Sequence, residues 1–326
     1  MTKRHKKYNI KKETAMTRIK NWSISVLLAG AMLFGLQCYS STSSLKFAQV
    51  SDVHYYTGQN NTTYKMIAES PKLLDDAIDQ ITPNVSFVMF TGDQIDKPFE
   101  KELSAFLPHT EKINVPWYFA FGNHDTMVGG YLNPSVYMQL INKYNKNYKF
   151  EKSYYSFVPQ KGYKVIVLDT IIRDRLTSNG RIGDEQLKWL DNELANSKKD
   201  TVLIFMHIPV IEPYNSPNHR LTDADKMEEI LSKYKNPIGV FQGHYHGAKI
   251  TQKDNILYVS CPALVSYPNA FRMVTVSNYR NKVVFNIENK ETRLTNIQKL
   301  AKILVFGTTV YTGEEKDQNA TITIKK

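Results

Sequence analysis

The pentapeptide Phe121-Gly122-Asn123-His124-Asp125 is the starting point for interpreting this 326-residue chain. It follows the apolar run Trp117 to Ala120, which predicts a buried strand, so its polar residues fall where that strand ends. Asn123 and His124 bring an amide oxygen and a titratable nitrogen into one loop. Because loops also carry Asn and His for turn formation, the pentapeptide alone does not define a site.

Four more stretches repeat this order of apolar strand and polar loop. Five of the eight histidines lie in the five stretches together. The additional stretches are Asp52-Val53-His54, Gly92-Asp93-Gln94-Ile95-Asp96, His207 and Gly243-His244-Tyr245-His246. Open α/β sheets place their sites beyond the carboxyl ends of strands. We therefore expect the five stretches to form one common site. His109 and His219 match none of these stretches and are predicted to be surface residues.

The composition is that of a globular protein, with 42% hydrophobic and 22% charged residues. The formal charge of +11 is uneven, since the first 20 residues hold eight lysines and arginines against one glutamate. The remainder is only about +4, so a basic face for nucleic acid is not indicated, and a DNA-binding nuclease is disfavoured.

Residues 1–44 are predicted to be a signal peptide or a membrane anchor with a Ser/Thr-rich exit at 40–44. The apolar segment 22–36 would span about 22 Å as a helix, short of the roughly 30 Å hydrocarbon layer, which favours a cleaved signal. The expected location is periplasmic or extracellular, with an uncleaved membrane anchor as the alternative. Met16 is an alternative start, and Cys38 raises lipidation, although the bulky Gln37 precedes it.

Residues 45–326 are predicted to form one α/β domain in which strands and helices alternate, with mostly strands after the last histidine. Asp184 is a candidate helix cap, and the loop 211–220 is the expected rim of the site. Strands are expected near 46–50, 85–90, 117–120, 154–157, 163–168, 201–206, 238–241, 256–259, 271–276, 283–287 and 321–324, and helices near 71–81, 98–107, 134–144, 183–196, 222–234 and 294–304.

Aspartate, histidine and asparagine without thiolates form a borderline-hard donor set suited to Mn, Fe, Zn or Mg. His244 and His246 are two residues apart, so on extended backbone both point to one side and can serve neighbouring metal ions. Asp93, beside Gly92, is the best candidate for a bridging carboxylate. Two such ions would share a hydroxide and polarise a phosphoryl oxygen, which allows hydrolysis without a protein nucleophile.

The five stretches resemble the pattern of the calcineurin-like metallophosphoesterase family: Asp-x-His, Gly-Asp-x-x-Asp, Gly-Asn-His-Asp/Glu, His and Gly-His-x-His. The resemblance implies a four-layer α-β-β-α sandwich of two mixed sheets flanked by helices. It implies one metal ion on Asp52, His54, Asp93 and His246, and another on Asp93, Asn123, His207 and His244. It also implies that His124 is an unligated acid oriented by Asp96.

Two departures from the pattern of the family's protein phosphatases argue against that branch of the family. Lys97-Pro98 and Asp125 stand where protein phosphatases of the family have Arg-Gly and Glu. Gly180-Arg181-Ile182 and His207-Ile208-Pro209 are similar to bacterial members grouped with class III cyclic nucleotide phosphodiesterases.

We therefore predict an exported dinuclear phosphohydrolase that prefers phosphodiesters and acts on a small phosphoester by direct attack of a metal-bridging hydroxide. The alternatives are a phosphomonoesterase, a lipid or nucleotide pyrophosphatase, and a non-catalytic scaffold that retains the fold. The intact donor set argues against the scaffold.

Overall fold

Two six-stranded sheets form the centre of the computed structural model, which describes residues 42–81, 85–306 and 309–326. The order of the first sheet is β12 (Ala320–Lys325), β11 (Lys282–Glu291), β10 (Ala270–Asn278), β1 (Ser43–Val50), β2 (Phe87–Thr91) and β3 (Trp117–Ala120). Strands β1, β2 and β3 are parallel to one another, and β10 is antiparallel to β1, β11 to β10 and β12 to β11. In the second sheet the edge strands β4 and β8 are antiparallel to their neighbours; its order is β4 (Tyr155–Phe157), β5 (Tyr163–Val167), β6 (Thr201–Phe205), β7 (Ile238–Gln242), β9 (Ile256–Ser260) and β8 (Lys249–Lys253).

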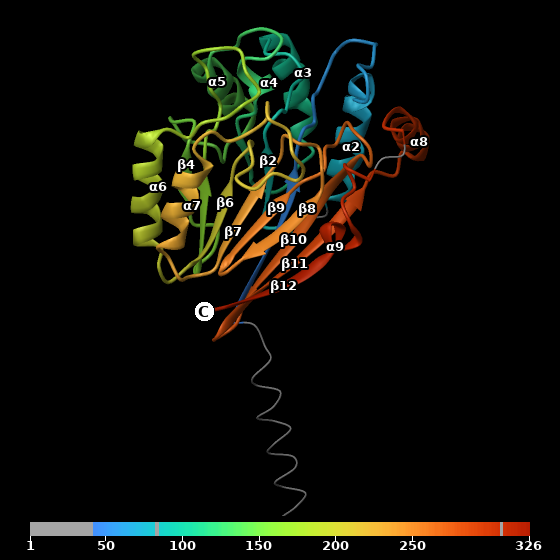
Figure 1. Ribbon diagram of the computed structural model, residues 1–326. Coiled ribbons are helices and arrows are strands. Elements are labelled where there is room, and N and C mark those ends of the chain that lie inside the picture. The colour runs from blue at the N-terminus through green and yellow to red at the C-terminus, as the bar shows by residue number, and fades with distance from the viewer. Residues whose placement is uncertain (1–41, 82–84, 307–308) are drawn as a thin grey trace, which may run out of the picture. The chain divides into compact units, whose positions relative to one another are not determined.

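Helices lie on both sides of the strands, with α6 and α7 along one side and α2 and α8 along the other (Figure 1). The helices are α2 (Ser70–Gln80), α3 (Glu100–Thr110), α4 (Asn123–Thr126), α5 (Pro134–Tyr144), α6 (Asp184–Asn196), α7 (Ala224–Ser232), α8 (Thr295–Leu304) and α9 (Glu315–Gln318), with a 3-10 turn η1 (Ile67–Glu69). The predicted fold of two mixed sheets flanked by helices is confirmed.

Aromatic side chains join the two sheets. Phe47 of β1 contacts Phe205 of β6 and Phe241 of β7 edge to face, with ring centroids 5.2 and 5.0 Å apart. These residues are fully buried, and aromatic pairs of this geometry add stability beyond the area they bury. The sheets are thus held face to face, and the parallel strands of both end at the same edge (Figure 1).

Some local expectations differ from the structure. The edge strand β8 was not predicted, because its sequence Lys-Ile-Thr-Gln-Lys has no apolar run and is partly exposed. Asp184 does not cap α6; it is the first helical residue, after Gly183, and pairs with Lys226 at 2.8 Å. Strand β1 begins at Ser43 and so takes in the last two residues of the predicted exit.

The predicted leader falls almost wholly outside the described residues, as do the alternative start Met16 and Cys38. Among residues 42–81, 85–306 and 309–326, no helix is both long and apolar enough to cross a membrane.

A buried arginine fastens the short helix α9 to the sheets. The Arg272 side chain on β10 is fully buried and donates to main-chain carbonyls: Nε and Nη2 to Ser260 at 3.2 and 3.0 Å, Nη2 to Asp317 at 2.7 Å, and Nη1 to Gln318 at 2.9 Å. Loss of this donor leaves buried carbonyls without partners.

We expect Arg272→Met to lower the free energy of unfolding by about 3 kcal/mol, because several carbonyls lose their donor at once. Urea denaturation followed by circular dichroism measures the change. Arg280→Met, at an exposed position after β10, is the control and should change stability by no more than about 0.5 kcal/mol. Equal effects of the two substitutions would contradict the assigned role.

Candidate metal centre

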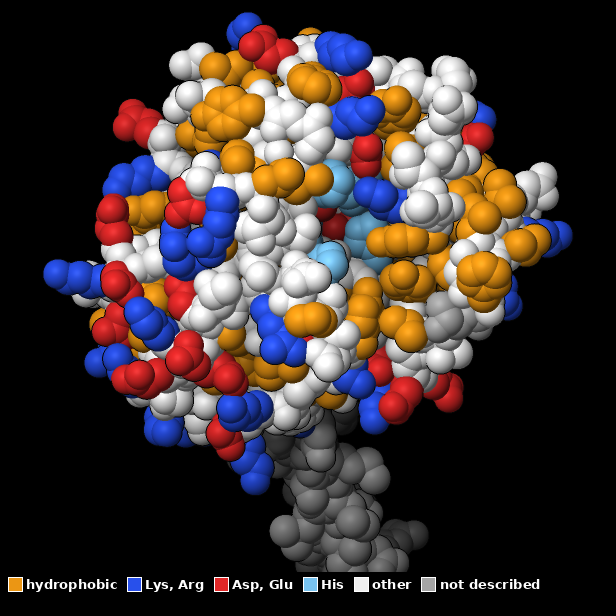
Figure 2. Space-filling model, turned by 45° about the horizontal axis from the view of Figure 1, so that its top comes forward, with side chains coloured by type: hydrophobic (Ala, Val, Ile, Leu, Met, Phe, Trp, Pro, Cys, Tyr) orange, Lys and Arg blue, Asp and Glu red, His pale blue; other side chains and the backbone are white. Residues whose placement is uncertain are grey.

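The predicted ligands lie just beyond strands of both sheets. Asp52 and His54 follow β1, Asp93 follows β2, and Asn123 opens α4 after β3. From the second sheet, His207 follows β6, and His244 and His246 follow β7. The site therefore sits where the carboxyl ends of the two sheets meet, and Figure 2 shows histidine and acidic side chains around a hollow on this face.

The loops that carry these residues have an unusual backbone. Asp52, His54, Asp93, His244 and His246 all have positive φ, between 43° and 72°. For residues other than glycine this left-handed region costs on the order of 1 kcal/mol each and is concentrated at functional sites. Main-chain hydrogen bonds fix the turns, since His54 N donates to Asp93 O at 2.8 Å and Asp52 N donates to Gly92 O at 3.1 Å.

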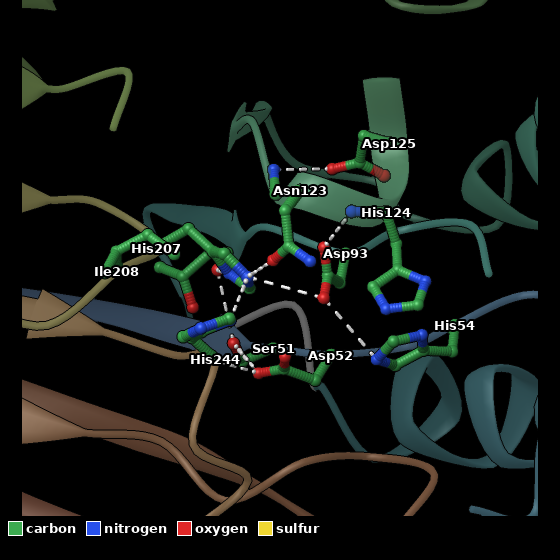
Figure 3. Close-up of polar contacts among 12 residues, drawn as sticks. Ser51, Asp52, His54, Asp93, Asn123, His124, Asp125, His207, Ile208 and His244 are labelled. Carbon is green, nitrogen blue, oxygen red and sulfur yellow. Dashed lines mark hydrogen bonds and ion pairs between the residues drawn. The ribbon is translucent and has the colours of Figure 1, made fainter. Parts of the chain in front are cut away.

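Asp93 occupies the centre of the site. Its Oδ2 atom lies 3.5 Å from His54 Nε2 and 3.4 Å from His207 Nε2, between the two halves of the site (Figure 3). Its Oδ1 atom accepts a hydrogen bond from the His124 main-chain N at 2.8 Å. A Cβ at Gly122 would overlap this carboxylate, so only glycine fits there. Asp93 is thus placed to contribute to two ion sites at once.

The first group of donors surrounds the Asp52 carboxylate. Asp52 Oδ1 lies 3.4 Å from His246 Nε2, and His246 Nε2 lies 3.3 Å from His54 Nε2. Asp52 is fully buried, which alone would raise the pKa of its carboxyl group; the charge of His246 and a hydrogen bond from it lower that pKa below its usual range. Ser51 Oγ donates to the other carboxylate oxygen at 2.6 Å and orients it.

The second group lies on the other side of Asp93. His207 Nε2 is 3.2 Å from Asn123 Oδ1 and 3.2 Å from His244 Nδ1. The ligand atoms of Asp93, His207 and His244 all lie within 4.8 Å of one another, as do those of Asp52, His54 and His246. The structure therefore brings all seven predicted ligands together at one site.

Hydrogen bonding shows that these residues suit a cation. His207 Nδ1 lies 2.8 Å from the Thr91 carbonyl, which can only accept, so Nδ1 carries a proton. In the neutral ring Nε2 is then a bare acceptor facing the oxygens of Asp93 and Asn123. Burial lowers the pKa of His207, but the charge of Asp93 and a hydrogen bond to it raise this pKa to about 9. Without a metal ion, a proton on His207 therefore supplies the positive charge. A bound cation would satisfy the same acceptors.

Two of the other ligand histidines, His54 and His244, are held as neutral rings. Burial, with the charge of Lys65, lowers the pKa of His54 to about 3, and burial together with His207 lowers that of His244. His54 Nδ1 is 3.0 Å from Asp96 Oδ1, and His246 Nδ1 is 2.8 Å from Ser266 Oγ. Such outer partners fix the orientation of a metal-binding ring. Neutral, oriented imidazoles are the form that binds metal ions.

His124 lies at the mouth of the site. Its Nδ1 donates to the main-chain carbonyl of Asp96 at 2.7 Å, and its side chain is 19% exposed, against 1% for His54. Burial lowers the pKa of His124, although Asp93 raises it. The ring is close enough to His54 and Asp93 for metal binding by distance alone, so its predicted unligated role needs a test of its own.

Asp96 acts on two neighbours in different ways. We expected it to orient His124, and the contact is made by its carbonyl oxygen, while the carboxylate lies 3.9 Å from His124 Nδ1. The carboxylate instead bonds to His54 and lies 3.3 Å from Lys65 Nζ. Sequence spacing could not distinguish main-chain from side-chain contacts.

The roles of two residues near the site, Asp125 and His219, were not predicted. Asp125 is fully buried and accepts from the main-chain N of Gly122 at 2.7 Å and of Ile95 at 3.2 Å, which fixes the loop before α4; burial and then Asp93 raise its pKa to about 8. His219, expected at the surface, is half-buried, with its ring 5.1 Å from that of His244. Its position in the expected rim loop was the one available signal.

The chain matches the calcineurin-like phosphoesterase family over residues 45–248 and belongs to that family, as predicted. It is 26% identical over 188 residues to a probable glycerophosphodiester phosphodiesterase of Arcobacter nitrofigilis. The match covers 56% of this chain and 64% of the relative, so the chain spans less than two thirds of that relative's length. It is 24% identical over 230 residues to a probable cyclic nucleotide phosphodiesterase of Colwellia psychrerythraea, covering 67% of this chain and 80% of the relative.

Phosphatases are also among the similar proteins. Human tartrate-resistant acid phosphatase type 5 is 25% identical over 253 residues, which covers 71% of this chain and 76% of the relative. A dimetal phosphatase from Danio rerio has the same fold, with a TM-score of 0.59, 18% identity and coverage of 74% of this chain and 95% of that one.

The central position of Asp93 predicts different metal losses for two substitutions. After reconstitution with Mn, we expect Asp93→Ala to reduce the metal content from about two ions per chain to below one, because both groups lose a donor. Asn123→Ala removes a donor from one group only and should retain at least one ion. Elemental analysis of desalted protein measures both, with the exposed Asp225→Ala as control. Equal losses in the two variants would contradict a bridging position.

Proposed function

We propose that this protein hydrolyses phosphoesters of small molecules, with phosphodiesters preferred, at a site that holds two divalent or Fe/Mn-type metal ions. The observation that carries the proposal is the convergence of seven donors from two sheets around the Asp93 carboxylate. Bound metal ions would supply Lewis-acid stabilisation of a phosphoryl group and a hydroxide at neutral pH.

The chain's own residues set the direction of proton transfer. Because His124 Nδ1 is committed to the Asp96 carbonyl, Nε2 is the ring atom that can carry a proton to a leaving oxygen. The negative charge of a bound phosphoester favours the protonated ring. Cys261 is buried and burial raises the pKa of its thiol to about 12, so it is a poor nucleophile. Water is therefore the nucleophile that we propose.

The preference for diesters rests on two observations. Two of the relatives are named as probable phosphodiesterases. Lys97-Pro98 and Asp125 also depart from the pattern of the protein phosphatases. Similarity to the acid phosphatase makes a phosphomonoesterase the second candidate.

Substitution of His124 tests the mechanism. His124→Ala should retain about two metal ions and lose activity by about 100-fold or more, because a general acid typically contributes 10²–10⁴-fold. His109→Ala is the matched control, since His109 bonds to Asp75 and Tyr55 outside the donor cluster. Loss of a metal ion from His124→Ala would instead show that His124 is a metal ligand. Unchanged activity would show that His124 takes no part in the reaction.

A substrate panel tests the reaction class. Reconstituted protein should hydrolyse cyclic nucleotides or aryl phosphodiesters faster than the matching monoesters, lose activity with a chelator and regain it with Mn. Faster monoester hydrolysis would favour the phosphatase. No hydrolysis across diesters, monoesters and lipid-linked phosphates, despite bound metal, would favour the scaffold.

We propose further that the protein is exported to a periplasmic or extracellular location, with retention by a membrane anchor as the alternative to cleavage. The basic residues 1–20 and the apolar segment 22–36 support this proposal. Mass analysis of the mature N-terminus tests it: cleavage after the apolar segment means a signal peptide, and an intact segment in the membrane fraction means an anchor. An intact chain in the cytoplasm would contradict export.

A further inference from the structure

Aromatic rings form an arc that begins at one metal-ligand histidine and ends at another. Tyr64 lies against His246, with ring centroids 5.8 Å apart, and stacks on Tyr311 at 5.5 Å with an interplanar angle of 18°. The arc continues through Tyr214, Tyr245 and His219, each ring 5.1–6.4 Å from the next, and His219 lies 5.1 Å from His244. We call these five residues, Tyr64, Tyr311, Tyr214, Tyr245 and His219, the aromatic arc.

Segments far apart in the sequence build the aromatic arc. Tyr64 lies in a turn closed by paired main-chain bonds between Thr62 and Lys65, of 3.3 and 2.9 Å. Tyr214 belongs to the rim loop after His207, and its hydroxyl donates to the Tyr245 carbonyl at 2.8 Å. Tyr311 comes from the C-terminal part of the chain, where its carbonyl accepts from Ala248 N at 2.9 Å. Hydrogen bonds to main-chain atoms thus hold the segments that carry Tyr64, Tyr214 and Tyr311 in place.

The C-terminal part and the rim loop meet over the glycine that follows His246. A Cβ at Gly247 would lie 3.2 Å from the Val310 carbonyl oxygen and 3.4 Å from the Tyr214 ring. Tyr311 lies outside residues 45–248, the part that matches the family. The family pattern therefore does not account for this wall of the site.

The members of the aromatic arc differ in exposure. Tyr245 is 3% exposed and serves as packing, whereas Tyr64, Tyr214 and Tyr311 are half-buried. Figure 2 shows hydrophobic side chains beside the histidines at the edge of the hollow. Partly exposed aromatic rings next to the metal-ligand histidines suit a substrate with a flat apolar group.

We propose that Tyr64 and Tyr311 form a stacking subsite for a planar aromatic group of the substrate, a nucleobase or an aryl ring, next to the metal centre. The inference rests on the proposed function and deepens it by naming the substrate class. A phosphoester whose phosphoryl group lies at the donors can place its ring against Tyr64, because the Tyr64 ring contacts that of the ligand His246. A base can stack on an aromatic side chain whichever base it is, and such stacking changes affinity by roughly tenfold per ring.

Binding to the full, metal-loaded chain tests the subsite without requiring turnover. Two matched pairs of ligands differ only in the aromatic group: adenosine 5′-monophosphate against ribose 5-phosphate, and phenylphosphonate against methylphosphonate. We expect the wild type to bind the aromatic member of at least one pair roughly tenfold more tightly by calorimetry. A preference confined to the first pair identifies a nucleobase, and one confined to the second identifies an aryl ring.

Substitutions then assign the preference to the two tyrosines. Tyr64→Leu and Tyr311→Leu keep apolar volume but cannot stack, so they should weaken aromatic binding roughly tenfold and change the non-aromatic partners less than twofold. Tyr64→Phe and Tyr311→Phe should retain the preference. Tyr144→Leu, at the end of α5 and 37% exposed, is the control and should leave both pairs unchanged. Metal content should stay at about two ions in every variant.

The outcomes separate this proposal from the proposed function. Equal binding of aromatic and non-aromatic partners by the wild type, or a preference that survives both leucine variants, overturns the stacking subsite even if phosphoesters are hydrolysed. A preference that the leucine variants remove supports the subsite even if no substrate of the panel is hydrolysed.

Discussion

The structure depends on a cluster of buried hydrogen-bond acceptors at the metal centre. The donors that face these acceptors are too few to satisfy them. Asp52 and Asp93 are buried, and the ring nitrogens of four histidines face them at 3.4–3.5 Å or face one another at 3.2–3.3 Å. Buried charge of one sign is strongly unfavourable unless opposite charge is supplied. The left-handed loops, the close approach of Gly122 to Asp93 and the outer partners of the histidines all serve to hold these atoms in place. The domain is organised to keep a position for positive charge.

Much of this could be predicted from sequence, because the fold puts strand ends at one edge and the ligands follow strands directly. Asp93 and His207 needed only their place after β2 and β6 to be brought together. Fold class and family followed from the same pattern. Edge strand β8 was not predicted, because a half-exposed strand without an apolar run shows little hydrophobic periodicity.

The rest depended on how loops fold back, which short-range patterns do not encode. His219 and Tyr311 reach the site from segments whose course is set by contacts distant in sequence, such as that between Ala248 and Tyr311. Asp96 was assigned to one partner, but it meets His124 with its carbonyl and His54 with its carboxylate. Residue identity fixes which groups are available; three-dimensional packing decides which of them is used.

The donors come from the ends of β1, β2 and β3 in one sheet and of β6 and β7 in the other. An ion held there would therefore cross-link the two sheets of the domain. Whatever binds the folded chain and not the unfolded one shifts the folding equilibrium by mass action. A metal ion bound at these strand ends would thus raise the free energy of unfolding, so that its removal would weaken the fold as well as the site.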